Sequence, residues 1–278
     1  MQNGKQVIRD GQPLYTNVET TIPVPDLFRT EAPFVERNVR LDYLGNHHLQ
    51  DPRTDESQFF TEISYSFTER LGIIFSAPVL IRNNFGAPGT SGYGDVESGI
   101  RYVLFGDEND APFKLALGFN VEAPTGDAAR ELGEGHTLIE PEVLMFQKIS
   151  EVTFLQEQFS IGTPTSGAGR TTEFSYNLAI GHVFRDISNS EYFLFPTAVF
   201  ELNGRAGSGG MEAGVSIVDL TAGLRWFMGS KAIAGIAMSA PVTQTREFEQ
   251  QFIFSIIYRY GPPEEEAPSG APSSRAYF

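Results

Sequence analysis

The sequence predicts an all-β protein, a closed antiparallel transmembrane β-barrel of about twelve strands. Three observations predict this fold class. Apolar residues recur at every second position along segments of about ten residues, the length that crosses a bilayer as a tilted strand. The connections between these segments alternate between short and longer ones. No apolar run reaches the roughly 18 residues of a transmembrane helix, although the chain is 41% hydrophobic.

The alternation places the strands. In the clearest segment Val218, Leu220 and Ala222 fall on one face, whereas Asp219 and Thr221 fall on the other. A helix would bring apolar residues together at spacings of three and four instead. We expect strands at residues 36–45, 57–67, 71–82, 93–106, 112–124, 136–149, 152–162, 172–184, 191–203, 215–228, 231–242 and 248–260.

The connections indicate the orientation. Short turns are expected around residues 68–70, 150–151 and 229–230, and longer, Gly-rich or polar loops around 125–135 and 204–214. Outer-membrane barrels have short periplasmic turns and longer external loops. An even number of strands puts both chain ends on the side of the short turns. We therefore expect a bacterial outer-membrane protein in contact with outer-membrane lipids.

Two end segments flank the predicted barrel of residues 36–260. Residues 1–35 carry Pro23, Pro25 and Pro33 and no clear strand period, and we expect a periplasmic extension or a segment inserted into the lumen. Residues 261–278 begin with a run of prolines and glutamates, which predicts a disordered acidic periplasmic tail. Either end could bind a protein partner. The N-terminus has no signal-peptide core, so we expect a mature form whose signal has been removed.

Composition excludes several classes of function. The formal net charge of -15 would repel nucleic-acid phosphates, so we expect no nucleic-acid partner. The absence of cysteine excludes a disulfide or a thiolate metal site, and no cofactor is implied.

Three motifs resemble one family. They are Gly94-Asp95-Val96-Glu97 followed by Gly99-Ile100-Arg101-Tyr102, Gly118–Gly126 ending in Pro-Thr-Gly, and Phe195–Gly204 containing Glu-Leu-Asn-Gly. In this order the motifs resemble the outer-membrane transporter family labelled "MetA-pathway of phenol degradation", over roughly residues 36–260. The resemblance implies a barrel and the passage of small organic molecules, hydrophobic or aromatic compounds among them. It implies no catalytic residues.

The strand directions sort the inward charges along the barrel axis. The predicted acidic outer lumen contains Asp95, Glu97, Glu122, Glu140, Glu142, Glu201 and Asp219. The predicted basic periplasmic end contains Arg101, Lys114, Lys148, Arg225 and Arg259. An acidic mouth would attract cations, since rings of charge set selectivity in pores. The alternative is structural, because inward charges on neighbouring strands can pair and fill a lumen.

Three functions remain open. We expect a channel or transporter for passive passage of small solutes; the alternatives are a non-conducting barrel that anchors a partner complex and a lipid-modifying barrel enzyme. For the enzyme, His136 near Ser160 or Ser175 is the candidate, but the sequence gives no triad geometry. We therefore expect no enzyme. Glu157 falls on the apolar face of its strand, which leaves the register there open to a bulge.

Overall fold

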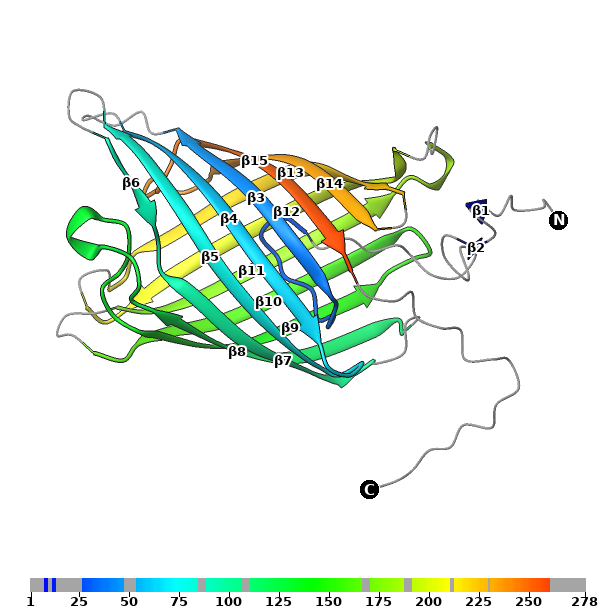
Figure 1. The fold of residues 1–278 in the computed structure, drawn as a ribbon, viewed down its shortest axis with the longest axis horizontal. Coiled ribbons are helices and arrows are strands. Elements are labelled where there is room, and N and C mark those ends of the chain that lie inside the picture. Colours follow the sequence, from blue (N-terminus) through cyan, green and yellow to red (C-terminus); the bar gives the residue numbers. More distant parts are fainter. Residues whose placement is uncertain are drawn as a thin grey trace, which may run out of the picture.

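Twelve long strands form one closed antiparallel sheet in the computed structural model of this chain (Figure 1). Each strand pairs with the strand before and after it, and the first, β3 (Asn38–His47), also pairs with the last, β15 (Gln250–Arg259). This ladder runs from Gln250 opposite His47 to Arg259 opposite Asn38. The sheet therefore has no free edge, as a barrel in lipid requires. The predicted fold class is confirmed.

The structure describes residues 8–9, 12–13, 27–47, 54–84, 89–106, 111–166, 171–187, 192–210, 213–229 and 231–260. The predicted acidic tail, His48 and most of residues 1–35 lie outside these ranges. Within them, no helix is long and apolar enough to cross a membrane.

The remaining strands follow the alternation of the sequence. Those of the barrel are β4 (Thr54–Ser66), β5 (Leu71–Asn84), β7 (Val96–Phe105), β8 (Phe113–Ala123), β9 (Leu138–Lys148), β10 (Thr153–Pro164), β11 (Thr172–Val183), β12 (Leu194–Ser208), β13 (Ser216–Met228) and β14 (Ala232–Pro241). The short β6 (Thr90–Tyr93) precedes β7 and pairs with the far half of β5. Outside the barrel sheet, β1 (Ile8–Arg9) pairs with β2 (Gln12–Pro13). Two 3-10 turns occur, η1 (Ala128–Arg130) and η2 (Arg185–Ile187).

The two faces of the strands differ as the period predicts. In β15, Phe252, Phe254 and Ile256 are exposed on the outer face, whereas Gln251 and Ser255 are buried on the inner face. Large exposed apolar side chains are the expected outer surface of a barrel that meets hydrocarbon.

The connections define two ends of the barrel. The turn end carries short connections, such as residues 67–70 and 229–231, together with the first and last residues of the barrel sheet. The loop end carries the longer connection 124–137, which includes η1.

Glu157 lies on the outer face of β10 without a bulge. Pairing with β11 is continuous from Thr153 to Gly162, so Leu155, Glu157 and Phe159 share the outer face. The Gln147 side chain donates to Glu157 Oε1 at 3.3 Å. Register shifts occur instead between β7 and β8 and between β12 and β13.

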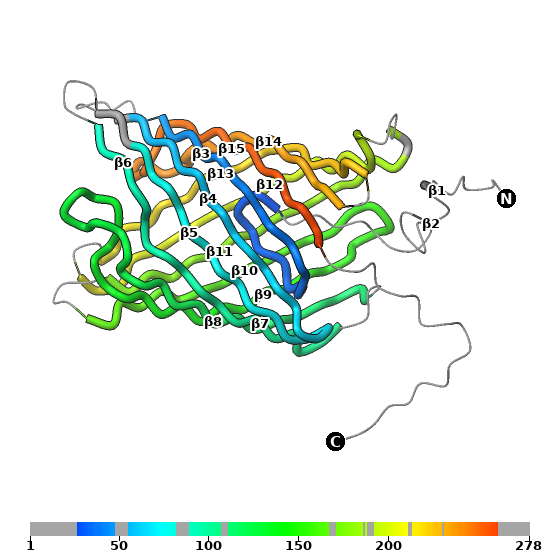
Figure 2. Tube along the Cα trace, in the orientation of Figure 1, coloured from blue at the N-terminus to red at the C-terminus, as the bar shows by residue number. Residues whose placement is uncertain are grey.

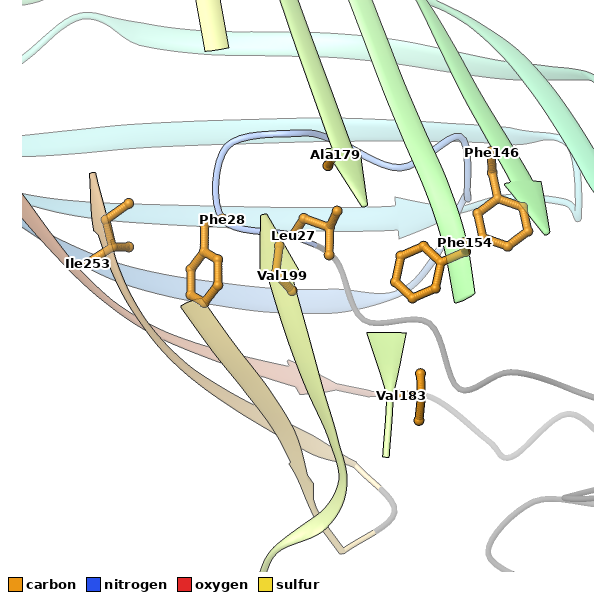
Figure 3. Close-up of a cluster of buried hydrophobic side chains, with 8 residues drawn as sticks. All are labelled: Leu27, Phe28, Phe146, Phe154, Ala179, Val183, Val199 and Ile253. Atoms are coloured by element: carbon orange, nitrogen blue, oxygen red, sulfur yellow. The ribbon is translucent and has the colours of Figure 1, made fainter. Parts of the chain in front are cut away.

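Residues 27–36, here the lumen segment, pass through the interior of the barrel before entering β3 (Figure 2). The side chain of Leu27 is 0% exposed. The main apolar core lies around this segment and not between two sheets. It consists of Leu27, Phe28, Phe146, Phe154, Ala179, Val183, Val199 and Ile253 (Figure 3).

Candidate functional site: the lumen and its outer vestibule

A single carboxylate binds the start of the lumen segment. The Phe28 amide donates to Glu201 Oε1 at 2.9 Å, and the Arg29 amide donates to Glu201 Oε2 at 3.0 Å. Glu201 is in the middle of β12 and is 1% exposed. Hydrogen bonds to an ionised acceptor are stronger than neutral ones, so this pair of bonds fixes the backbone of the segment to the wall.

Three arginines of the inner wall bind carbonyl groups of the lumen segment. Arg225 donates to the carbonyl of Leu27 at 2.7 Å, Arg40 to that of Phe28 at 2.6 Å, and Arg101 to that of Ala32 at 3.0 Å. These arginines come from β13, β3 and β7, on different sides of the barrel. The segment is therefore held across the whole width of the lumen.

Ion pairs and ring contacts add to these hydrogen bonds. Arg101 pairs with Glu31 of the segment and, at 3.3 Å, with Glu142 of β9. Arg259 pairs with Glu36 at 2.9 Å. The Lys114 ammonium lies 5.4 Å from the centre of the Phe34 ring, which is within the range of a cation–π contact.

Two glycines make room for the Phe28 ring. A Cβ atom on Gly235 would lie 2.9 Å from Phe28, and one on Gly223 would lie 2.4 Å from it. The Arg225 guanidinium lies 4.3 Å from the ring centre. Gly223 and Gly235 thus form a recess in the inner faces of β13 and β14 that a larger residue would fill.

The predicted basic residues surround the lumen segment. Four of the five contact it through a carbonyl, a carboxylate or a ring, and Lys148 is half-buried on β9. Insertion of residues 1–35 into the lumen was one of two expectations, but contact between this segment and the basic residues was not predicted. The feature of the sequence that could have indicated a buried segment is the presence of the apolar Leu27, Phe28 and Phe34 in a stretch without a strand period.

The predicted acidic residues separate into two groups. Glu142, Glu201 and Asp219 are buried and hydrogen-bonded to the wall or to the lumen segment. Glu97 of β7 and Glu122 of β8 are half-buried and directly opposite each other in the register. Glu140 is half-buried, whereas Asp95 is buried and binds a loop, as described below.

A cavity of about 280 Å³, here the vestibule, lies on the loop side of the lumen segment. Its floor includes Arg29 of the segment, and its wall includes the side chains of Gln158, Ser160 and Asn177. Asn177 donates to Gln158 at 3.0 Å and to the carbonyl of Arg29 at 3.4 Å. The vestibule is thus a polar chamber whose inner end is the lumen segment.

A second, much smaller space lies beside the lumen segment. It measures about 30 Å³ and is lined by the segment and by β3, β4, β5 and β7, with Glu31, Glu62 and Ser64 among the polar residues. This volume corresponds to about one water molecule. The segment therefore packs tightly against the wall on the side of the apolar core and leaves a narrow polar gap on the opposite side.

Similarity to known proteins concerns the three-dimensional structure. No family model matches the chain, and no curated protein is similar to it in sequence. An outer membrane channel from Pseudomonas putida F1 matches with a TM-score of 0.61 at 13% identity, over 85% of this chain and 100% of its own. The NanC porin matches with a TM-score of 0.53 at 10% identity, over 81% and 100%. LpxR from Salmonella typhimurium gives 0.50 at 9%, over 80% and 100%.

The fold is that of an outer-membrane β-barrel. At these identities the similarity concerns the fold alone. Because no family model matches the chain, the resemblance to the phenol-degradation family stays a prediction.

The outer surface of this outer-membrane barrel has aromatic residues near the turn end. Tyr102, Phe105 and Tyr258 are exposed there, as expected of an aromatic girdle at a membrane interface. Phe146 and Phe227 lie at the same end but point inward and are buried, because they pack around the lumen segment and the core beneath it.

The loop that follows β8 is held at the mouth by Asp95. This carboxylate, between β6 and β7, accepts the amide of Gly126 at 2.7 Å and that of Glu134 at 2.6 Å. Leu132 of the loop is 1% exposed, and a Cβ atom on Gly92 would lie 2.7 Å from it. The predicted outer-lumen Asp95 therefore shapes a loop and does not face an open channel.

Among the described residues, no hydrogen bond joins His136 to Ser160 or Ser175, whereas His182 Nδ1 lies 2.9 Å from the Thr153 hydroxyl oxygen. His136 Nδ1 lies 2.9 Å from the carbonyl oxygen of Glu134. Ser175, one of the two serines considered with it, donates to Glu173 at 3.2 Å. His47 pairs with Asp55 at 2.7 Å, where β3 and β4 meet the loop end.

Proposed function

We propose that the protein lies in the bacterial outer membrane and serves as a narrow channel for the passive passage of small solutes. The observation that carries this proposal is the polar vestibule above a lumen segment that leaves a thin polar gap beside it. A barrel whose only task was structural would have no need of a chamber lined by charged and amide groups. In this proposal the barrel catalyses no reaction.

Acidic residues on the inner wall favour cations in this channel. Glu97 and Glu122 face each other on neighbouring strands, and such like-charged pairs destabilise a sheet unless another role retains them. On the inner wall they would raise the local concentration of cations. The predicted acidic outer lumen is therefore kept here as a proposal that mainly concerns Glu97, Glu122 and Glu140.

Two sources of support point to different solutes. The motif resemblance favours hydrophobic or aromatic compounds, whereas the lining of the vestibule favours polar ones. The polar lining belongs to the described structure of this chain, so we give it more weight. Solute uptake into proteoliposomes distinguishes polar from aromatic solutes. A sugar and a phenol of similar size are compared, because they differ mainly in the number of hydrogen bonds that they can form.

The second candidate function is a non-conducting barrel that anchors a partner complex. It is favoured by the lumen segment, which crosses the interior and is bound on several sides. Residues 1–35 or 261–278 would supply the contact with the partner protein.

Planar-bilayer recording of the full chain distinguishes the two functions. A channel is expected to give discrete conductance steps, small because of the narrow gap. Silence from protein that migrates faster on a detergent gel before heating than after it would favour the anchoring barrel. Recovery of the expressed protein outside the outer-membrane fraction would contradict the proposed location.

A further inference from the structure

The vestibule has a lining that specifies the chemistry of an occupant. Apart from Gly204 and Ile217, every residue that lines it carries a charged, amide or hydroxyl group. Its volume of about 280 Å³ corresponds to about nine water molecules at about 30 Å³ each. A chamber of this size and polarity suits one small hydrophilic molecule.

Negative charge exceeds positive charge around the vestibule. The lining has four carboxylate residues, Glu140, Glu173, Asp219 and Glu247, and two arginines. Both arginines are engaged within the protein. Arg205 pairs with Glu173 at 3.3 Å and also with Glu247, and Arg29 lies 3.7 Å from Asp219 and donates to Gln251 at 3.2 Å. The excess of carboxylates favours a cationic ligand.

Asn203 supplies an independent indication of a ligand. Its side chain lines the vestibule and is 2% exposed. Its amide nitrogen donates to Asp219 Oδ1 and to Thr221 Oγ1, each at 3.0 Å, which fixes the orientation of the amide. Its Oδ1 atom is buried and accepts no hydrogen bond from the described residues. Such an acceptor is costly unless a donor reaches it.

We propose that the vestibule binds a small hydroxylated amine. The ammonium group would lie beside the carboxylates of Glu140 and Glu173, and a hydroxyl would donate to Asn203 Oδ1. An inorganic cation fits less well, since within the described ranges no three His, Asp or Glu side chains are placed to hold a metal ion. The proposal deepens the proposed channel function, on which it rests for the route by which the ligand enters.

Calorimetric titration of the full chain in detergent tests the ligand class. The probes are glucosamine, N-acetylglucosamine, which lacks the positive charge, and propylamine, which lacks the hydroxyls. Glucosamine is expected to bind at least about tenfold more tightly than either comparison compound. Equal affinity for the three compounds, or no binding of glucosamine, would overturn the inference.

Two variants and one matched control locate the site. Glu140→Gln and, separately, Glu173→Gln should each weaken glucosamine binding about tenfold, because each removes a charge from the lining. Glu157→Gln makes the same change of charge on the outer face of β10, away from the lining, and should leave the affinity within about twofold. An equal loss in the control would overturn the proposed site. The heat-dependent gel shift of each variant verifies that it is folded.

The proposed binding site and the proposed channel can be refuted separately. Conductance steps without glucosamine binding would overturn this inference and leave the channel standing. Glucosamine binding to a barrel that never conducts would support the vestibule site and overturn the channel.

Discussion

Glu201 is the residue on which the position of the lumen segment depends most. Its two oxygens each accept one backbone amide, and the cationic side chain of Arg225 binds the carbonyl of Leu27 next to them. A carboxylate at this depth would be unfavourable without such partners. The wall and the segment therefore satisfy each other's buried polar groups. Removing a group from one of them leaves its partner on the other without a hydrogen bond.

Replacing Glu201 with Gln should loosen the lumen segment. Gln offers one acceptor oxygen where two amides donate, and losing a hydrogen bond to a charged group costs roughly 1.5–3 kcal/mol. The chain has no cysteine, so a single Thr30→Cys substitution gives a clean reporter at a fully buried position. Maleimide labelling of this cysteine should become about tenfold faster or more in Glu201→Gln. Glu173→Gln is the control, and equal acceleration there would contradict the role of Glu201.

The recess for Phe28 gives a second prediction at this scale. Gly235→Ala places a methyl group 2.9 Å from the ring and should destabilise the seated segment by about 1–3 kcal/mol, as overpacking does. The same cysteine reporter measures the effect. Gly162→Ala, whose nearest neighbour would lie at 3.5 Å, should change nothing. In a Phe28→Ala background the clash with the ring is gone and only Arg225 Cγ, at 3.0 Å, stays close, so Gly235→Ala should cost clearly less. An equal cost in both backgrounds would disprove the recess.

Among the elements, strands and connections were predictable from the sequence to different degrees. Strand positions and faces followed from the alternation, because lipid and lumen impose opposite polarity on neighbouring residues. The lumen segment lacks a period, and its contacts join residues far apart in the chain, such as Phe28 and Glu201. No local pattern encodes such contacts. The inner face of β9 nevertheless changes from Glu140 and Glu142 to Leu144 and Phe146, which marks where the lumen is filled.

The loop after β8 supports a prediction at the scale of elements. Asp95→Ala removes the acceptor of two loop amides and should free the connection 124–137. Trypsin should then cleave after the exposed Arg130 several-fold faster than in the parent protein. Asp127→Ala is the matched control, since this residue makes no side-chain capping bond to η1. Unchanged cleavage in Asp95→Ala would mean that other contacts hold the loop.

Across the whole molecule, the predicted separation of charge has two different causes. The basic residues at the turn end bind the lumen segment, so their location reflects packing. Sequence alone could not distinguish this from selectivity, because a filled lumen and a charged pore both place charge on inward positions. Within the described ranges, Glu97 and Glu122 form no hydrogen bond or ion pair with the segment, and they are the better candidates for a role in conduction.

The double variant Glu97→Gln, Glu122→Gln should lower the preference for cations. Two charges fewer beside a narrow passage reduce the local enrichment of cations, and the reversal potential in a potassium chloride gradient should move toward zero. Glu157→Gln, which alters a charge on the outer face, is the control. An unchanged reversal potential would refute the role assigned to the inner-wall acids.

The position of the lumen segment directly before β3 has a consequence for assembly. The barrel closes where β3 meets β15, the first and last of its strands, and this pairing cannot form until the end of the chain is present. We expect the ten residues before β3 to be inside when the seam forms, because they are bound to β3 on one side of it and to β12 on the other. The last pairing, between β3 and β15, would then form around the lumen segment. Any factor that assists insertion would have to delay this closure until the segment is bound.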